Sequence, residues 1–350
     1  MRILITGGCG FLGSHLVEHL LKTTDAELVI LDKLTYASAG FDRLRDITNS
    51  NPNLTAGGRV HILGCDLSQP IPEGVAHEIS DVDYVIHAAA ETHVDNSIVD
   101  PLPFLKSNVL GTHHLLWWAR SARKMPKRIF LVSTDEVYGP ASWESTGNVE
   151  TDMFRPANPY AAAKAGGEAV GMAYANTYKL PITIVNTMNL YGERQHPEKY
   201  IPLVIRRALS GEQVQIHADP TKTRSGTRFY IHCRNYASAI TWLIEHDGRL
   251  GLSSTLQLPL KIHVSGEREI SNEQLALMIA EIVGKPLNYE LVDFHSSRPG
   301  HDLRYALDDS MIRGMGWKQP LNTEESLART VRWFLRDENR RWLYLDQKGA

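Results

Sequence analysis

Short apolar runs alternate with longer helix-like stretches through the first half of the chain. The runs lie at residues 2–6, 28–31, 60–63, 84–87, 129–133 and 182–185. Runs of this length are typical of buried strands, and the stretches between them are long enough for crossover helices. The pattern therefore predicts an α/β fold, a Rossmann-type doubly wound parallel sheet with helices on both faces.

The pattern changes after about residue 189. Helix-like segments are separated there by irregular stretches that contain Gly and Pro. The helix-like segments lie at 200–210, 233–246, 272–283 and 324–337, and the irregular stretches around 217–228, 247–260 and 295–301. This predicts a smaller C-terminal α/β lobe. We therefore divide the chain into a sheet domain, 1–188, and a lobe formed mainly by 189–350, from which some segments can return to the main sheet.

Composition narrows the class of protein. Of 350 residues, 43% are hydrophobic and 22% are charged, as in a globular protein. With 37 basic and 40 acidic residues the formal net charge is −3, so neither nucleic acid nor an acidic membrane is expected as a partner. Three widely spaced cysteines, Cys9, Cys65 and Cys233, match no disulfide framework or zinc motif. With no leader-like start and no long apolar run, a cytoplasmic protein is the expectation.

A glycine-rich turn follows the first apolar run. Gly7, Gly10 and Gly13 separate this run from a helical pattern at 15–22. Glycines so placed allow a tight turn and a close approach of the backbone to a pyrophosphate, and the helix N-terminus supplies amide donors. Asp32 ends the next run, where a carboxylate accepts the ribose hydroxyls of NAD and repels the 2′-phosphate of NADP. The pattern predicts a NAD site; the alternative interpretation of Asp32 is a solvated residue at a strand end.

Further positions complete the predicted cofactor site. Segments that follow the later strands lie where the ribose, adenine and phosphates of a dinucleotide pass. The additional cofactor-binding residues that we expect are Phe11, Leu12, Lys33, Leu34, Thr35, Asp66, Leu67, Ala88, Ala89, Ala90 and Ser107.

Tyr160 and Lys164 form a YxxxK pair at the start of a predicted helix, which Asn158 can cap. The i, i+4 spacing places phenol and ammonium on one helix face. A neighbouring ammonium and an oxidised nicotinamide both favour the phenolate, so Tyr160 is a candidate base for an alcohol. Lys164 lies beside it, and we expect both Tyr160 and Lys164 to contact the cofactor as well. The spacing alone is not specific, because residues 344 and 348 repeat it; the place of Tyr160 after the run 129–133 distinguishes it.

Thr134, Asp135 and Glu136 follow that run directly, at the sheet edge where ligands bind in doubly wound folds. Thr134 can bond a substrate hydroxyl beside Tyr160. Two adjacent carboxyls with different pKa values can act as one acid and one base, which a redox reaction alone does not need. Outside this context a solvated acidic turn would be the alternative interpretation.

Seven motifs occur in order over residues 6–307: TGGCGFLGSH, LDKLTYA, AAETHVD, STDEVYG, NPYAAAK, PEKYIPL and RPGHDLRYALD. Together they closely resemble the extended short-chain dehydrogenase/reductase superfamily, and within it the nucleotide-sugar 4,6-dehydratases, above all the dTDP-glucose branch. STDEVYG and RPGHD are specific to that branch.

The resemblance implies a NAD-dependent conversion of an NDP-hexose to an NDP-4-keto-6-deoxyhexose. Tyr160, assisted by Lys164 and Thr134, would take the 4-hydroxyl proton while hydride leaves C4 for NAD. Glu136 would remove the C5 proton. Asp135 would protonate the departing 6-hydroxyl, and hydride would return to C6.

The resemblance also implies a site for the nucleotide-sugar substrate. Its residues would be Thr92, Thr134, Asn189, Lys199, Tyr200, His217, Arg228, His263, Arg298 and His301. Two segments depart from the family pattern, 214–219 and 227–235, and His217 and His263 occupy positions of an aromatic residue and an Asn. The motifs therefore indicate the reaction and leave the base open among dTDP, UDP, CDP and GDP.

Two alternatives remain open. A 4-epimerase or decarboxylase of the superfamily would share the NAD site and Tyr160 but would not require the adjacent carboxyls. A non-catalytic nucleotide-sugar-binding regulator is disfavoured because all five catalytic positions are present. Family members usually pair two helices of each subunit, so we expect a homodimer through about 102–124 and 160–179; no metal is expected.

Overall fold

The main layer of the fold is a seven-stranded sheet. The computed structural model describes residues 1–52, 58–250, 259–293 and 303–345. The strand order is β11-β6-β5-β4-β1-β2-β3, and each neighbouring pair is parallel. The strands are β1 (Arg2–Thr6), β2 (Glu27–Asp32), β3 (Val60–Gly64), β4 (Tyr84–His87), β5 (Arg128–Thr134), β6 (Ile182–Thr187) and β11 (Leu260–Val264). Six of these strands coincide with the predicted apolar runs. The predicted fold class is confirmed.

The strand order reverses between β1 and β4. From β1 the chain proceeds to β2 and β3 on one side, and β4, β5 and β6 extend the sheet on the other. Loops that leave the carboxyl ends of β1 and β4 therefore diverge and open a crevice, which is where doubly wound folds bind ligands. The predicted cofactor and catalytic segments follow β1, β2, β4 and β5, so the topology brings them to one edge.

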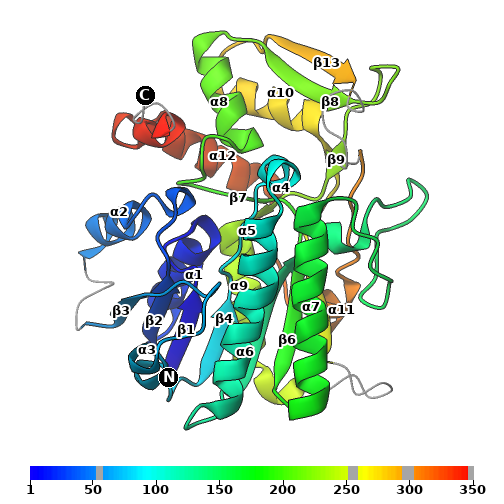
Figure 1. Ribbon diagram of the computed structural model, residues 1–350. Coiled ribbons are helices and arrows are strands. Elements are labelled where there is room, and N and C mark those ends of the chain that lie inside the picture. The colour runs from blue at the N-terminus through cyan, green and yellow to red at the C-terminus, as the bar shows by residue number, and fades with distance from the viewer. Residues whose placement is uncertain (53–57, 251–258, 294–302, 346–350) are drawn as a thin grey trace.

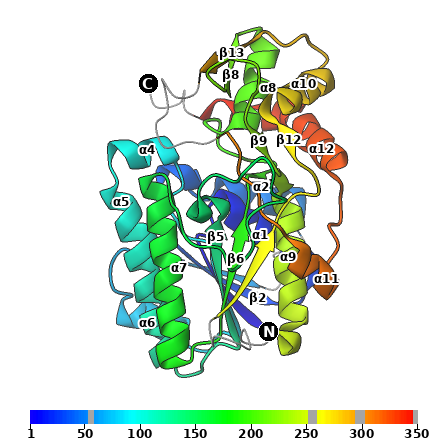
Figure 2. The same cartoon turned by 90° about the vertical axis from the view of Figure 1, so that its right-hand side faces the viewer.

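Helices cover both faces of the sheet, which lies between them in two perpendicular views (Figures 1 and 2). One face carries α5 (Leu102–Phe104), the π-helix η3 (Leu105–Leu110), α6 (Gly111–Ser121) and α7 (Pro159–Tyr178), and the other carries α1 (Phe11–Thr23) and α9 (Cys233–Glu245). The shorter elements are η1 (Tyr36–Ser38), α2 (Asp42–Ser50), α3 (Glu73–Glu78), α4 (Val94–Val99), η4 (Asp135–Tyr138), η5 (Asp247–Arg249) and α11 (Ser310–Met315).

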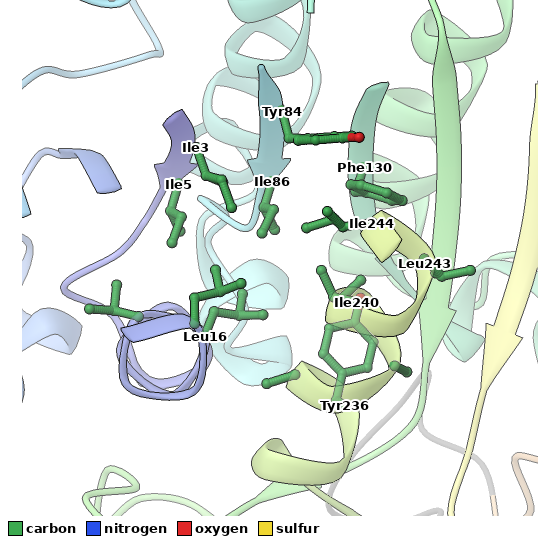
Figure 3. Close-up of a cluster of buried hydrophobic side chains, with 14 of the residues drawn as sticks. Ile3, Ile5, Leu16, Tyr84, Ile86, Phe130, Tyr236, Ile240, Leu243 and Ile244 are labelled. Atoms are coloured by element: carbon green, nitrogen blue, oxygen red, sulfur yellow. The ribbon is translucent and has the colours of Figure 1, made fainter. Parts of the chain in front are cut away.

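The core under α1 and α9 shows why these strands are apolar throughout. Figure 3 shows Ile5 and Ile86 of the sheet facing Leu16 of α1, with Tyr236 and Ile240 of α9 beside them. All five side chains are fully buried. Because helices cover both faces of a parallel sheet, its strands lack the alternation of half-exposed strands. Truncating one such side chain to Ala costs about 2–5 kcal/mol of stability.

The C-terminal lobe has a separate core. Val204, Ile216, Leu275 and Phe334 are fully buried there. The main elements of the lobe are α8 (Tyr200–Ser210), β8 (Val214–Ala218), α10 (Asn272–Val283), β13 (Tyr289–Asp293), α12 (Thr323–Leu335) and η6 (Asp337–Leu343). Strands β8 and β13 pair in parallel. Two short pairs complete it: β7 (Leu190–Tyr191) with β10 (Ile231–His232), and β9 (Thr227–Arg228) with β12 (Ile270–Ser271).

Two segments from the second half of the chain return to the main domain, one as a strand of the sheet and one as a helix that covers it. β11 pairs with β6, and α9 packs beside α1 on the sheet. Ile312 of α11 and Trp317 join the same core. The expected return of late segments to the sheet thus involves a strand and a helix, and the division at residue 188 stays a prediction.

The three cysteines are free thiols and buried. Within the described ranges, no helix combines the length and apolarity that crossing a membrane requires. The same ranges hold no cluster of three or more His, Cys, Asp or Glu side chains arranged for a metal ion.

Candidate active site

A cleft runs along the carboxyl edge of the sheet. Its walls come from the ends of β1, β2, β4, β5 and β6, and from Lys199, Tyr200 and Tyr230 on the side of the lobe. All five predicted catalytic residues line it: Thr134, Asp135, Glu136, Tyr160 and Lys164. Predicted cofactor residues in its wall are Gly7, Gly10, Phe11, Leu12, Gly13, Asp32, Lys33, Thr35, Asp66, Leu67, Ala88, Ala89, Ala90 and Ser107.

The glycine turn is closely packed against neighbouring backbone. A Cβ at Gly13 would lie 2.0 Å from the carbonyl oxygen of Gly7, and a Cβ at Gly7, whose φ is +71°, would lie 2.8 Å from Ala89 Cα. Gly10 is the N-cap of α1, so the first amides of this helix open into the turn. Without side chains, the backbone of the turn can come close to a bound pyrophosphate, and the first amides of α1 point to it.

Backbone amides orient Asp32 at the end of β2. Its Oδ2 accepts from Cys9 N at 2.9 Å and its Oδ1 accepts from Leu34 N at 2.8 Å. Each carboxylate oxygen keeps a second lone pair for a ribose hydroxyl. Leu34 supplies only this amide, because its side chain is exposed and lies outside the cleft wall. The contact of Leu34 with the cofactor stays a prediction, and it would be made by the backbone at this position.

Arg43 of α2 is a cleft residue that sequence reasoning missed. It is fully buried and donates to the carbonyls of Ala37 (2.7 Å), Ser38 (2.6 Å) and Arg194 (3.0 Å). It thereby fixes the loop after β2 at the end of the cleft near Asp32. A lone Arg in an amphipathic helix gives no signal for this role. Glu198 and Tyr230 also line the cleft without having been predicted.

Asp135, which is buried, and Glu136, which is partly buried, form an acid pair in η4. Burial raises the pKa of Asp135 to about 6, and a hydrogen bond from the Thr134 hydroxyl at 2.9 Å opposes the shift. Burial, followed by the charge of Asp135, raises the pKa of Glu136 to about 7, against a 3.0 Å hydrogen bond from Asn158. Between these values the pair holds one proton. It can then act as one acid and one base at neutral pH.

Tyr160 and Lys164 project from the first turns of α7. Asn158 caps this helix, accepting from Ala161 N at 2.8 Å, and Pro159 occupies its first position. Lys164 Nζ donates to the carbonyl of Val132 in β5 at 2.7 Å. Burial lowers the pKa of Lys164 to about 8, against the charge of Glu168. The helix thus brings phenol and amine to the end of β5, as the spacing predicted.

The protonation of Tyr160 differs from the expectation of a favoured phenolate. Burial raises the pKa of the phenol, and the charges of Glu136 and Asp135 raise it further, against a hydrogen bond with Thr134. The sequence-based expectation did not include the effect of the two carboxyls on the phenol. Because both carboxyls lie close to the phenol, a cation beside Tyr160 is needed to release its proton near neutral pH.

Among the predicted substrate residues, Thr92, Asn189, Lys199 and Tyr200 lie in the cleft wall with Thr134. Lys199 Nζ is 3.7 Å from Glu198 Oε1, and burial lowers the pKa of the amine. Tyr200 donates to the carbonyl of Asn272 at 2.8 Å, which anchors its ring to α10.

Two other predicted substrate residues, Arg228 and His217, lie outside the cleft wall. The guanidinium of Arg228 donates to the carbonyls of Thr227 (2.7 Å) and Leu303 (2.8 Å) and lies over the Tyr305 ring. Its charge still lowers the pKa of both Asp135 and Glu136. His217 lies on β8 away from the cleft. Arg298 and His301 fall outside the described residues.

The assignment of His263 to the substrate site is wrong. The side chain is fully buried in β11, with its Nε2 2.7 Å from the Tyr138 hydroxyl and its Nδ1 3.1 Å from the carbonyl oxygen of Asp308. Both ring nitrogens are thus engaged inside the protein. His263 fixes the packing behind the site and does not touch a substrate.

The parallel sheet, the glycine turn at its reversal point and the tyrosine–lysine helix define an extended short-chain dehydrogenase/reductase. Comparison with known proteins agrees with this class and narrows it. A family model described as GDP-mannose 4,6 dehydratase matches residues 4–330. The chain belongs to this family of nucleotide-sugar 4,6-dehydratases, which confirms the resemblance seen in the sequence.

The similarity to relatives and to solved structures extends over all or nearly all of the chain. The dTDP-glucose 4,6-dehydratases of Escherichia coli and Salmonella typhimurium are 34% and 36% identical, each over 100% of this chain and 96% of the relative. A trifunctional UDP-glucose 4,6-dehydratase of Arabidopsis thaliana is 34% identical, and the chain spans 49% of its length. The dTDP-glucose 4,6-dehydratase DesIV of Streptomyces venezuelae, a double mutant solved with NAD bound, has a TM-score of 0.81 at 34% identity over 98% of each chain. A UDP-glucose 4-epimerase of Thermus thermophilus in complex with NAD has a TM-score of 0.79 at 27% identity, over 96% of this chain and 100% of the epimerase.

Proposed function

We propose that this chain is a NAD-dependent nucleotide-sugar 4,6-dehydratase, a hydro-lyase that converts an NDP-hexose of the glucose type to the NDP-4-keto-6-deoxyhexose. The observation that carries the proposal is the adjacent pair of Asp135, which is buried, and Glu136, which is partly buried, in one cleft wall with Tyr160. Oxidation at C4 alone requires the tyrosine and the cofactor. The two carboxyls add the acid and the base that elimination of water across C5 and C6 requires.

The residues present fit NAD. The close backbone contacts at Gly13 and Gly7 exclude any side chain from the turn, and Asp32 presents a buried carboxylate at the end of β2. Gly7, Gly10 and Gly13 would hold the pyrophosphate at α1, and Asp32 would hold the adenosine ribose. When bound, NAD supplies the acceptor for hydride from C4 and the donor of hydride to C6.

The chain's own residues handle the protons. Tyr160, bonded to Thr134 and beside Lys164, takes the proton of the 4-hydroxyl. The ketone formed at C4 acidifies the C5 hydrogen, and Glu136 removes it. Asp135 donates a proton to the departing 6-hydroxyl, so that water leaves and the double bond forms between C5 and C6. For these roles the single proton of the pair has to lie on Asp135 when the substrate is bound, although Glu136 has the higher pKa of the two. The amine of Lys199 binds the diphosphate and offsets its charge.

The test is incubation of the protein with dTDP-, UDP-, CDP- and GDP-hexoses, followed by mass analysis. Loss of water from one of them is the expected result, and the nucleotide that reacts identifies the base. An unchanged mass with an altered sugar would instead support the 4-epimerase. If none of these nucleotide sugars reacts, the result would support the non-catalytic regulator. In an active protein, the Glu136→Gln variant should stop exchange of the C5 hydrogen with solvent while NAD stays bound.

We further propose that two copies associate through α5, η3, α6 and α7. Leu102, Leu105, Leu110 and Trp117 are 45–53% exposed along these helices, whereas Leu115 and Trp118 pack into the core. An apolar stripe of this kind is typical of an interface between helices. Light scattering tests the proposal, and a Trp117→Glu variant should be monomeric.

A further inference from the structure

A buried ion pair connects α7, the helix that carries Tyr160 and Lys164, to strand β11. Lys261 Nζ of β11 is 2.8 Å from Glu168 Oε2 of α7, and the two side chains are 7% and 2% exposed. The other carboxylate oxygen of Glu168 accepts from Ser133 Oγ and, at 2.7 Å, from Asn186 Nδ2. Taking two charges out of water is costly, so the attraction within a pair this deep adds little net stability.

The contacts of Glu168 lead directly to the catalytic residues. Ser133 precedes Thr134 in β5, and Asn186 also donates to the carbonyl of Thr134 at 2.9 Å. Glu168 follows Lys164 by one helical turn, which places the two side chains on one face of α7. Lys164 Nζ itself donates to Val132 of the same strand. The pair therefore joins α7, β5 and β6 at the point where the catalytic groups leave them.

The charged and titratable groups around Tyr160 and Lys164 come from several elements. They are Glu168 on α7, Asp135 and Glu136 on η4, His87 on β4 and, through Glu168, Lys261 on β11. Burial lowers the pKa of His87 to about 3, so this ring is neutral. Glu168 opposes the lowering of the Lys164 pKa, and Lys261 balances the charge of Glu168.

We propose that the Glu168–Lys261 pair is a positioning device of the active site, which keeps Lys164 protonated and holds the end of β5 in place beside Tyr160. The inference rests on the proposed function for the role of Tyr160 and Lys164. Glu168 supplies the negative charge that keeps the lysine cationic. Lys261 balances that charge and fixes the position of the carboxylate.

Three variants test the pair: Glu168→Gln, Lys261→Met and the double variant. Glu168→Gln leaves Lys261 as an unbalanced cation, so the titration midpoint of Lys164 should fall by about 1 pH unit. Lys261→Met leaves the carboxylate unbalanced, so the midpoint should rise by about as much. The double variant removes one charge of each sign and should return it close to the parent value.

The primary readout is the reactivity of Lys164 toward an acylating reagent as a function of pH, followed by mass spectrometry of the purified full-length protein. This measurement needs no sugar substrate, so it remains decisive if the chain dehydrates none. In an active protein, the pH profile of the first hydride transfer should move in the same directions. Lys179→Asn, at the far end of α7, and Glu245→Gln, at the end of α9, are controls for loss of an exposed charge.

Displacements of opposite sign in the single variants that cancel in the double variant support the proposal. Displacements of the same sign, or none beyond the controls, overturn it. Should Lys261→Met fail to fold, the comparison of Glu168→Gln with the double variant still measures the sign of the Lys261 effect, and a midpoint that is equal in these two also overturns the proposal.

Discussion

The side-chain amide of Asn158 donates to Glu136 Oε2 at 3.0 Å while its oxygen caps α7. One residue thus ties the acid–base pair to the helix that carries Tyr160 and Lys164. Because the cap fixes where α7 begins, it also fixes the distance between the carboxyl pair and the phenol.

Replacing Asn158 with Ala should affect both stability and pH dependence. Loss of the cap costs about 1 kcal/mol, measured by denaturant unfolding. Loss of the donor to Glu136 removes an interaction that lowers the pKa of this carboxyl. The pH at which C5 exchange reaches half its maximal rate should therefore rise. Asn322→Ala, which removes the cap of α12, is the matched control: it should cost similar stability and leave the pH profile unchanged.

The stability of the protein should depend on the charge of Glu136. Its pKa in the folded protein, about 7, exceeds the ordinary value of 4.5. The stability present below pH 4.5 is therefore lost as pH rises through 7. Glu136→Gln should consequently be more stable than the parent by about 1–3 kcal/mol at pH 8, with a smaller difference at pH 5. Equal differences at both pH values would contradict this, and Glu245→Gln, at an exposed site, should show none.

Gly13→Ala should weaken NAD binding at least about tenfold, or prevent folding of the turn. The added methyl group would lie 2.0 Å from the carbonyl oxygen of Gly7 and would displace the backbone that receives the pyrophosphate. The dissociation constant for NAD, measured by equilibrium dialysis, checks this. Gly74→Ala in α3 has nothing within 4 Å of the new Cβ and should leave NAD binding as it is. Unchanged NAD binding in Gly13→Ala would remove the turn from the cofactor site.

His263→Ala should destabilise the protein without altering substrate affinity. It removes a buried ring and its hydrogen bonds with Tyr138 and the Asp308 carbonyl, at a cost of about 2–4 kcal/mol. Lys199→Ala should show the opposite behaviour, a raised KM with little change in thermal stability. A raised KM in His263→Ala together with an unchanged melting temperature would return His263 to the substrate site.

The local parts of the site were predictable because each depends on short-range spacing. The strand, glycine turn and helix around Gly13 are adjacent in sequence, so their geometry follows from the residues themselves. The same holds for Tyr160 and Lys164, one helical turn apart. Since loops at the carboxyl ends of parallel strands meet at one edge, the meeting of Asp135 with Tyr160 could also be expected.

The positions of Lys261, His263 and Arg43 could not be predicted in this way. β11 lies beside β6, although about 70 residues separate them in the chain, and only this pairing brings Lys261 to Glu168 and buries His263 against Tyr138. A pattern of apolar residues identifies a strand but not its neighbour. Arg43 is similar, because its partner Arg194 comes from a distant loop.

The sequence by itself thus determined the fold class, the glycine turn and the candidate catalytic side chains, because these depend on neighbours along the chain. The tertiary structure alone decided which charges surround those side chains. Burial and the approach of Asp135, Glu136, Glu168 and Lys261 from three elements, η4, α7 and β11, set the charges at the site, and these effects act through space rather than along the chain.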